Sequence, residues 1–146
     1  MAKDPSLSNA AVLALLNQLD TQINGGTGAV VNVYASGCCA VPSVADAAAT
    51  GTLLAQLAMC STNAFGCAAD QDPGGRITAN CICSDCCANA TGTADYYRIL
   101  TQACGTSVWQ GTVGTTSCFD LTLNTACITS GSTVSVTSLT IDLAET

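Results

Sequence analysis

The sequence predicts a mainly β protein, a β-sandwich of about eight strands with one N-terminal α-helix. The first observation behind this prediction is that the strongest helical periodicity lies before Gly25. The second is that, from Ala29 onward, short segments rich in Val, Ile, Leu and Thr alternate with Gly, Asn, Asp and Ser, as strands alternate with turns. Strands at such spacing bury their apolar faces by packing one sheet against another.

The predicted helix carries its apolar residues at three- and four-residue spacing, which places them on one face. These residues are Val12, Leu15, Leu16, Leu19 and Ile23. The polar residues of the same segment lie on its other faces: Asn17, Gln18, Asp20 and Gln22. Asp4, Ser6 or Ser8 offers a cap for the first turn, and Gly25-Gly26 ends the helix. We expect the apolar stripe to pack on the core, and a contact between subunits of an oligomer is the weaker alternative.

With 146 residues, the chain corresponds to one domain that can bury a core. We predict a flexible N-terminal arm at residues 1–8 and a single helix-plus-sandwich domain at residues 9–146. The segments predicted as strands are 29–36, 52–59, 76–83, 95–101, 107–113, 120–125 and 133–142. Segments 76–83 and 95–101 are expected to pair as one hairpin. The apolar face of the last segment switches near Thr137-Ser138, which predicts a bulge or a crossing between sheets.

Composition and charge exclude several kinds of partner. Only 9% of residues are charged, and three basic residues stand against ten acidic ones, for a net charge of -7. Nucleic acid binding needs clustered Lys and Arg, so we expect no nucleic acid and no acidic membrane surface as partner. No stretch approaches the roughly 18 to 20 apolar residues of a membrane span. So low a charge is typical of a protein that packs against other subunits, or of a stable secreted one.

The residue types do not point to an enzyme. The chain has no histidine, which removes the commonest general base and the commonest metal ligand. No pair of carboxylates is spaced as a site, and Asp70 and Asp72 are expected to shape a turn and not to bind calcium. We therefore predict no catalytic residue and no cofactor.

Arg98 is the one basic residue inside a core-like segment, and we expect it to form a partly buried ion pair with Asp95 or Asp120. A catalytic role for Arg98 is the weaker alternative. The aromatic residues of the same region are expected to be core or interface anchors and not a stacking platform: Tyr96, Tyr97 and Trp109.

The chain has eleven cysteines, an odd number. The class of protein depends on whether they form disulfides, bind a metal or carry out redox chemistry. The densest group, CICSDCC at residues 81–87, has enough sulfur for one zinc ion, but no second C-x-x-C faces it. Its C-x-x-C also lacks the helix that activates redox cysteines. We therefore favour structural disulfides over metal or redox chemistry and expect most thiols to be oxidised in the mature protein. The candidates are Cys38, Cys39, Cys60, Cys67, Cys81, Cys83, Cys86, Cys87, Cys104, Cys118 and Cys127.

Adjacent cysteines are not expected to bond to each other, because neighbours on extended chain point apart. The loop cysteines Cys38 and Cys39 and the turn cysteines Cys86 and Cys87 are the natural candidates to meet. The N-terminal segment does not read as an export signal, because its apolar run at residues 10–16 is short and continues as an amphipathic helix. We therefore expect synthesis in a cytoplasm.

A series of sequence segments resembles a family of small structural proteins of tailed phages, encoded beside head and tail genes. The segments are AAATGTLLAQLAM, NAFGCAA, GRITAN, NATGTADYYRILTQ, VWQGTVGT, DLTLNT and ITSGSTVSVTSLTI. They cover nearly the whole chain from the helix to Ile141. The chain departs from the family where Cys81, Cys83, Cys86 and Cys87 stand in place of Ala, Ser and Thr.

The resemblance implies an N-terminal helix on two β-sheets and a structural protein of the virion. The specific function it implies is that of a capsid cement or decoration protein, which binds the outside of the head and locks neighbouring capsomers. Its partners would be the major capsid protein and other copies of itself, as a dimer or trimer. Three alternatives stay open: a tail or host-recognition component, a secreted disulfide-rich binding module, and a thiolate metal protein.

Overall fold

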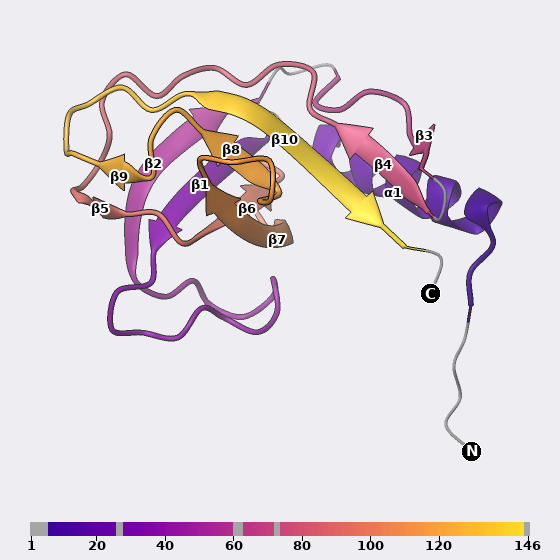
Figure 1. Cartoon of the computed structure of the whole chain (residues 1–146), viewed down its shortest axis with the longest axis horizontal. Coiled ribbons are helices and arrows are strands. Elements are labelled where there is room, and N and C mark those ends of the chain that lie inside the picture. Colours follow the sequence, from indigo (N-terminus) through magenta and orange to yellow (C-terminus); the bar gives the residue numbers. More distant parts are fainter. Residues whose placement is uncertain (1–5, 26–27, 60–62, 72–73, 145–146) are drawn as a thin grey trace.

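The computed structural model describes residues 6–25, 28–59, 63–71 and 74–144. It is mainly β, with one helix and a large mixed sheet in a sandwich-like arrangement, and this confirms the predicted class (Figure 1). The elements are α1 (Asn9–Asn24), β1 (Val30–Ala35), β2 (Thr52–Ala58), β3 (Ala69–Asp70), β4 (Gly75–Thr78), β5 (Gly92–Thr93), β6 (Tyr96–Leu100), β7 (Ser107–Gly114), β8 (Leu121–Leu123), β9 (Cys127–Ile128) and β10 (Val136–Leu143).

Eight strands form one sheet in the order β2-β1-β6-β7-β8-β10-β4-β3, and β5 and β9 form a separate ribbon. Neighbouring strands are antiparallel except β7 and β8, which run parallel. The long strand β10 pairs with β8 on one side and with β4 on the other (Figure 1). It thereby joins two parts of the sheet, β2-β1-β6-β7-β8 and β4-β3. One hydrophobic cluster unites the helix with both parts, including Leu16, Val33, Leu57, Ile99, Leu121 and Ile141.

Helix α1 begins after Ser8, whose side chain accepts a hydrogen bond from the backbone N–H of Ala11 at 3.3 Å. Val12, Leu16 and Ile23 of the predicted stripe are fully buried, but Leu15 is 49% exposed. Leu15 lies three residues after Val12, which turns it about 60° away from Val12 on the side opposite to Leu16, at the edge of the stripe. The residues of the predicted arm at positions 1–5, including the alternative cap Asp4, lie outside the described residues.

One row of polar side chains on α1 forms hydrogen bonds with the backbone of a neighbouring segment. The side-chain oxygens of Asn17, Asp20 and Asn24 accept hydrogen bonds from backbone N–H groups within residues 64–68, at 2.9–3.3 Å. That segment has few strand partners of its own, so the helix satisfies donors that would otherwise be unpaired. Residues at spacings of three and seven fall on one helix face, which explains how three side chains reach one segment.

The predicted hairpin between segments 76–83 and 95–101 is wrong. Strand β4 pairs with β10 and β3, whereas β6 lies between β1 and β7. After Thr78 the chain leaves β4 and crosses the molecule through isolated bridges that include Met59 with Ile82 and Asp85 with Val134. Alternation along a strand shows which face is buried but not which strand lies beside it. The cysteine-rich segment is therefore a crossing and not a hairpin turn.

Two smaller predictions are confirmed. The register between β10 and β8 shifts between Val136 and Ser138, which is the expected bulge. Asp70 pairs with Gly75 across a turn in which the backbone N–H of Gln71 donates to the carbonyl of Gly74. Asp72 lies outside the described residues.

Candidate functional site

A row of polar side chains crosses four strands of the sheet. In the strand register Gln56 of β2 faces Asn32 of β1, Asn32 faces Arg98 of β6, and Arg98 faces Gln110 of β7. Gln56 Nε2 donates to Asn32 Oδ1 at 2.9 Å, and Arg98 Nε donates to Gln110 Oε1 at 2.9 Å. Asn32 and Arg98 are each only 4% exposed, so this row holds the buried polar residues of the described core.

The predicted ion pair of Arg98 is wrong. Asp95 accepts hydrogen bonds from the backbone and hydroxyl of Ser36, and Asp120 accepts them from the backbone and hydroxyl of Thr112. Successive residues of a strand point to opposite faces. Tyr97 faces the side on which Asp120 lies, so Arg98 points to the other side. Within the described part of the chain, the ion pair that forms is Arg76 with Asp142, at the surface.

Arg98 instead binds the carbonyl groups of the loop that joins β1 to β2, residues 36–51. Its Nη1 donates to the carbonyl of Ala47 at 2.7 Å, and its Nη2 donates to that of Val44 at 3.4 Å. Gln110 Nε2 donates to the carbonyl of Pro42 at 2.6 Å. A cation on the sheet therefore anchors the middle of a long loop. No feature of the loop sequence shows this role, because the acceptors are backbone groups.

Tyr96 anchors the end of the same loop. Its hydroxyl donates to the carbonyl of Thr50 at 2.6 Å and accepts from the backbone N–H of Thr50 at 3.1 Å. The Tyr96 ring stacks on Tyr34 with centroids 5.0 Å apart, and the Arg98 guanidinium lies 6.0 Å from its centre. Tyr96 and Tyr97 are buried and Trp109 packs against the core, so all three act as anchors within the fold.

The outer surface of the β1–β2 loop is apolar and almost uncharged. Val41 is 42% exposed and Val44 is 56% exposed, although the carbonyls of this loop are held on the sheet. Asp46 is the one charged residue between positions 36 and 51. The loop also exceeds the roughly 12 to 15 residues beyond which loops in compact domains are usually functional or disordered. Its anchoring identifies it as a functional candidate.

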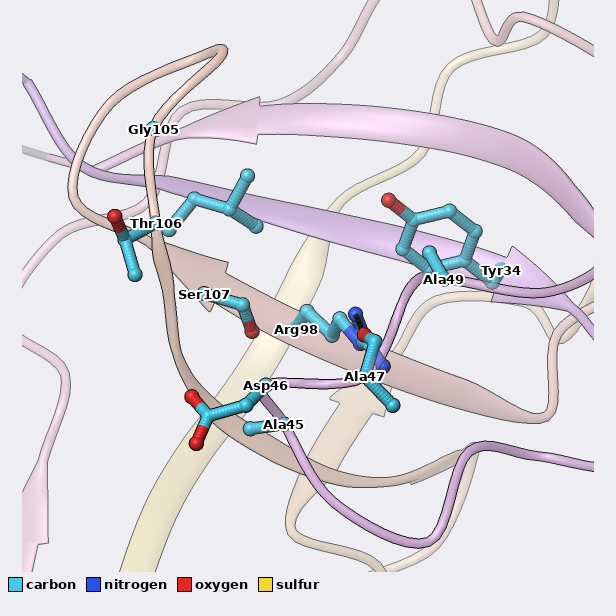
Figure 2. Close-up of a pocket in the computed structure, with 10 residues that line it drawn as sticks. Tyr34, Ala45, Asp46, Ala47, Ala49, Arg98, Gly105, Thr106 and Ser107 are labelled. Atoms are coloured by element: carbon cyan, nitrogen blue, oxygen red, sulfur yellow. Dashed lines mark hydrogen bonds between the residues drawn. The ribbon is translucent and has the colours of Figure 1, made fainter.

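A cavity of about 310 Å³ opens beside this loop, with Arg98 in its wall. Figure 2 shows the stretch from Ala45 to Ala49 on one side and Ser107 on another, with the carboxylate of Asp46 directed away from the guanidinium. The hydroxyl oxygen of Ser107 is buried and has no hydrogen-bond partner. The cavity therefore combines a cation with an unsatisfied hydroxyl.

Tyr97 is a second buried polar feature, on the opposite face of β6. Burial, and then the negative charge of Asp120, raise the pKa of Tyr97 above its usual value of 10.0. Its hydroxyl has no hydrogen-bond partner, and a Cβ added at Gly111 would lie 2.7 Å from the Tyr97 ring. Gly111 is thus required because any side chain on β7 at this position would overlap the Tyr97 ring.

The raised pKa of Tyr97 predicts a loss of stability at alkaline pH. The folded protein keeps the phenol protonated while the unfolded chain ionises, so this stabilisation is complete below pH 10 and falls as the pH rises beyond it. Chemical denaturation between pH 8 and about 11 should show that the free energy of unfolding falls more steeply with pH for the native chain than for Y97F. Equal slopes in the two proteins would contradict the prediction.

The cysteines lie mainly on the surface. Nine of them are exposed and free in the structure: Cys38, Cys39, Cys67, Cys83, Cys86, Cys87, Cys104, Cys118 and Cys127. Cys81 takes part in a disulfide, and Cys60 lies outside the described residues. No group of three or more metal-ligating side chains forms among the residues that the structure describes.

Asp85, inside the cysteine-rich crossing, has a structural role that the sequence did not indicate. Its carboxylate accepts hydrogen bonds from the backbone N–H groups of Gln56 and Cys87, at 3.0 and 2.9 Å. Its own backbone pairs in both directions with Val134. Asp85 thereby ties the crossing to β2 and to the segment before β10. An acidic residue within a C-x-x-C gives no signal of this kind in sequence.

The pairing of Cys38 and Cys39 with Cys86 and Cys87, and the oxidation of most thiols, stay predictions. Quantifying free thiols in the denatured, unreduced protein after exposure to air tests them. We expect few free thiols, because bridges worth about 2–4 kcal/mol each would be retained once formed. Nine or more titratable thiols would contradict the prediction.

The fold and the site together define a mainly β protein with an anchored, outward-facing apolar loop. No family model, curated protein or solved structure matches the chain. In the described ranges, no helix is long and apolar enough to span a membrane.

Proposed function

We propose that this chain is a structural protein of a tailed-phage virion, a cement or decoration protein that binds the outside of the head and locks neighbouring capsomers. Its partners are the major capsid protein and further copies of itself. The resemblance of segments such as NATGTADYYRILTQ and VWQGTVGT to small phage structural proteins supports this function. The protein acts mechanically, since a folded body clamped across capsomer boundaries raises the free energy needed to separate them.

The observation that carries the proposal is the β1–β2 loop. Its exposed valines, Val41 and Val44, present apolar surface, and Arg98, Gln110 and Tyr96 hold its backbone in place. Interfaces have cores depleted in charged residues, and a loop already fixed in position loses little conformational entropy on binding. These properties favour a contact surface for another protein.

The charge of the chain favours the exterior of a head. A net charge of -7 repels packed DNA, which occupies the interior. The low density of charge over the remaining surface also suits a body that packs among other subunits.

Immunogold electron microscopy of virions from the phage that encodes this chain tests the location. Labelling regularly spaced over the head supports the proposal. Labelling on the tail replaces it with a tail or host-recognition component, and virions that lack the chain by mass spectrometry refute a virion function altogether.

A binding assay tests the role of the loop. Capsids that lack the protein are mixed with the native chain or with V41S/V44S, and the bound fraction is measured by sedimentation. Because the proposed contact buries both valines against the capsid, their loss predicts binding at least about tenfold weaker. The control L15Q changes a similarly exposed residue on α1 and should leave binding unchanged. Native affinity in V41S/V44S would exclude the loop as the capsid contact.

A further inference from the structure

We propose that the cavity beside Arg98 binds a carboxylate, carried by an acidic side chain of a neighbouring polypeptide or by a small aliphatic acid. The site is argued from the cavity alone and does not depend on the proposed function. Its wall contains a buried cation without an acidic partner, a buried hydroxyl without any partner, and apolar groups for a short hydrocarbon chain.

The guanidinium of Arg98 has unused donors. Of its five N–H groups, one binds Gln110 and two bind the carbonyls of Ala47 and Val44. The other two, one on each terminal nitrogen, have no acceptor among the residues that the structure describes. Arginine is always charged in a protein, and a charge that is 4% exposed is costly to leave without a counterion. An anion that enters the cavity supplies both the acceptors and the opposite charge.

The hydroxyl of Ser107 provides a second, independent signal. Its oxygen is buried and makes no hydrogen bond, although Ser107 lies on the cavity wall at the start of β7 (Figure 2). A buried polar atom without a partner is rare in folded proteins and calls for an explanation. The oxygen itself is closed to solvent, so the Ser107 side chain must rotate toward the cavity before a ligand oxygen there can accept its hydrogen bond.

A carboxylate fits the site better than a phosphate group. Two oxygens in one plane match the fork of a guanidinium, and a single negative charge suffices where two carbonyls already face the cation. A doubly charged anion would be repelled more strongly by a protein of net charge -7 and by Asp46 at the rim.

The size and the remaining walls limit the ligand. A volume of about 310 Å³ lies at the low end for ligand pockets, which usually hold about 300–1,000 Å³. Leu100, Ala45 and Ala49 add apolar surface to the lining. The site therefore accommodates a short aliphatic chain that ends in a carboxylate, as a glutamate side chain does.

Titration of the full-length protein tests the site. Butyrate is compared with butyramide, its neutral analogue, by two-dimensional NMR at constant ionic strength, with chloride as the control anion. We expect butyrate to shift the amide signals of Ser107 and Ala47 with a Kd of about 1 mM, as suits a ligand of so few atoms. Equal shifts with butyramide or with chloride would overturn the proposal.

Variants separate binding from folding, because Arg98 also anchors the loop and R98Q is expected to unfold in part. S107A removes only the unpaired hydroxyl and should weaken butyrate binding about tenfold. D46N removes negative charge at the rim and should strengthen it about twofold. The control S117A changes an exposed serine outside the cavity and should have native affinity. Native affinity in S107A would overturn the proposal.

A capped Gly-Glu-Gly peptide distinguishes the two sources of the carboxylate. Tighter binding of the peptide than of butyrate identifies an acidic side chain of another polypeptide as the ligand. Tighter binding of butyrate identifies a small aliphatic acid. Both results support a carboxylate site, whereas binding of neither molecule refutes it.

Discussion

Replacement of Arg98 by methionine (R98M) is expected to lower the free energy of unfolding by about 2–4 kcal/mol. Methionine keeps the length of the side chain but donates no hydrogen bond. The carbonyls of Val44 and Ala47 and the side-chain oxygen of Gln110 then lose their donor. Each buried acceptor without a partner costs about 1–3 kcal/mol, and release of the loop into water recovers part of that cost.

Urea denaturation measures this effect, and limited proteolysis locates it, since a released β1–β2 loop is cut faster than the rest of the chain. R76M is the matched control, because Arg76 forms an ion pair with Asp142 at the surface, where such pairs contribute about 0–1 kcal/mol. Similar losses in R98M and R76M would mean that Arg98 does not anchor the loop.

Replacement of Gly51 by alanine is expected to destabilise the fold by about 3 kcal/mol or more. Gly51 ends the β1–β2 loop with φ at +80°, and a Cβ there would lie 2.0 Å from the carbonyl oxygen of Ala35. The atom that blocks it belongs to the backbone of β1, so no side-chain rotation relieves the overlap.

G131A provides a control with the same backbone angle. Gly131 also has φ at +80°, but a Cβ there has no atom within 4 Å. G131A therefore reports the strain of the left-handed conformation alone, about 1 kcal/mol. The difference between the two unfolding free energies measures the overlap at Gly51. Equal values would show that β1 moves aside.

Much of the fold follows from local patterns. Ser8 caps the helix because its hydroxyl is within reach of the first free N–H groups, and the bulge between Val136 and Ser138 appears as a switch of the apolar face. Pairing of strands is different, because one of the two partners of β4 is β10, far along the chain. Alternation alone could not select that partner over β6.

The sequence indicates one part of the candidate site, the cation, but not the groups that bind it, because these lie far from it in the chain. Arg98 stands out as the basic residue of an apolar segment, but its acceptors are carbonyls of Val44 and Ala47, and every residue has a carbonyl. The sequence therefore favours a carboxylate, Asp95 or Asp120, as the partner of the Arg98 charge. Those acids are occupied by Ser36 and Thr112.

The position of β10 determines when the molecule can fold during synthesis. β10 pairs with β8 through Leu139 and with β4 through Ile141, so β4 and β3 join the rest of the sheet through a strand that follows every other strand of the sheet in the chain. A nascent chain that ends before residue 136 exposes the open edges of both β8 and β4. Completion of the sheet therefore waits until β10 has been synthesised, and truncation before β10 should produce two unpaired edges prone to aggregation.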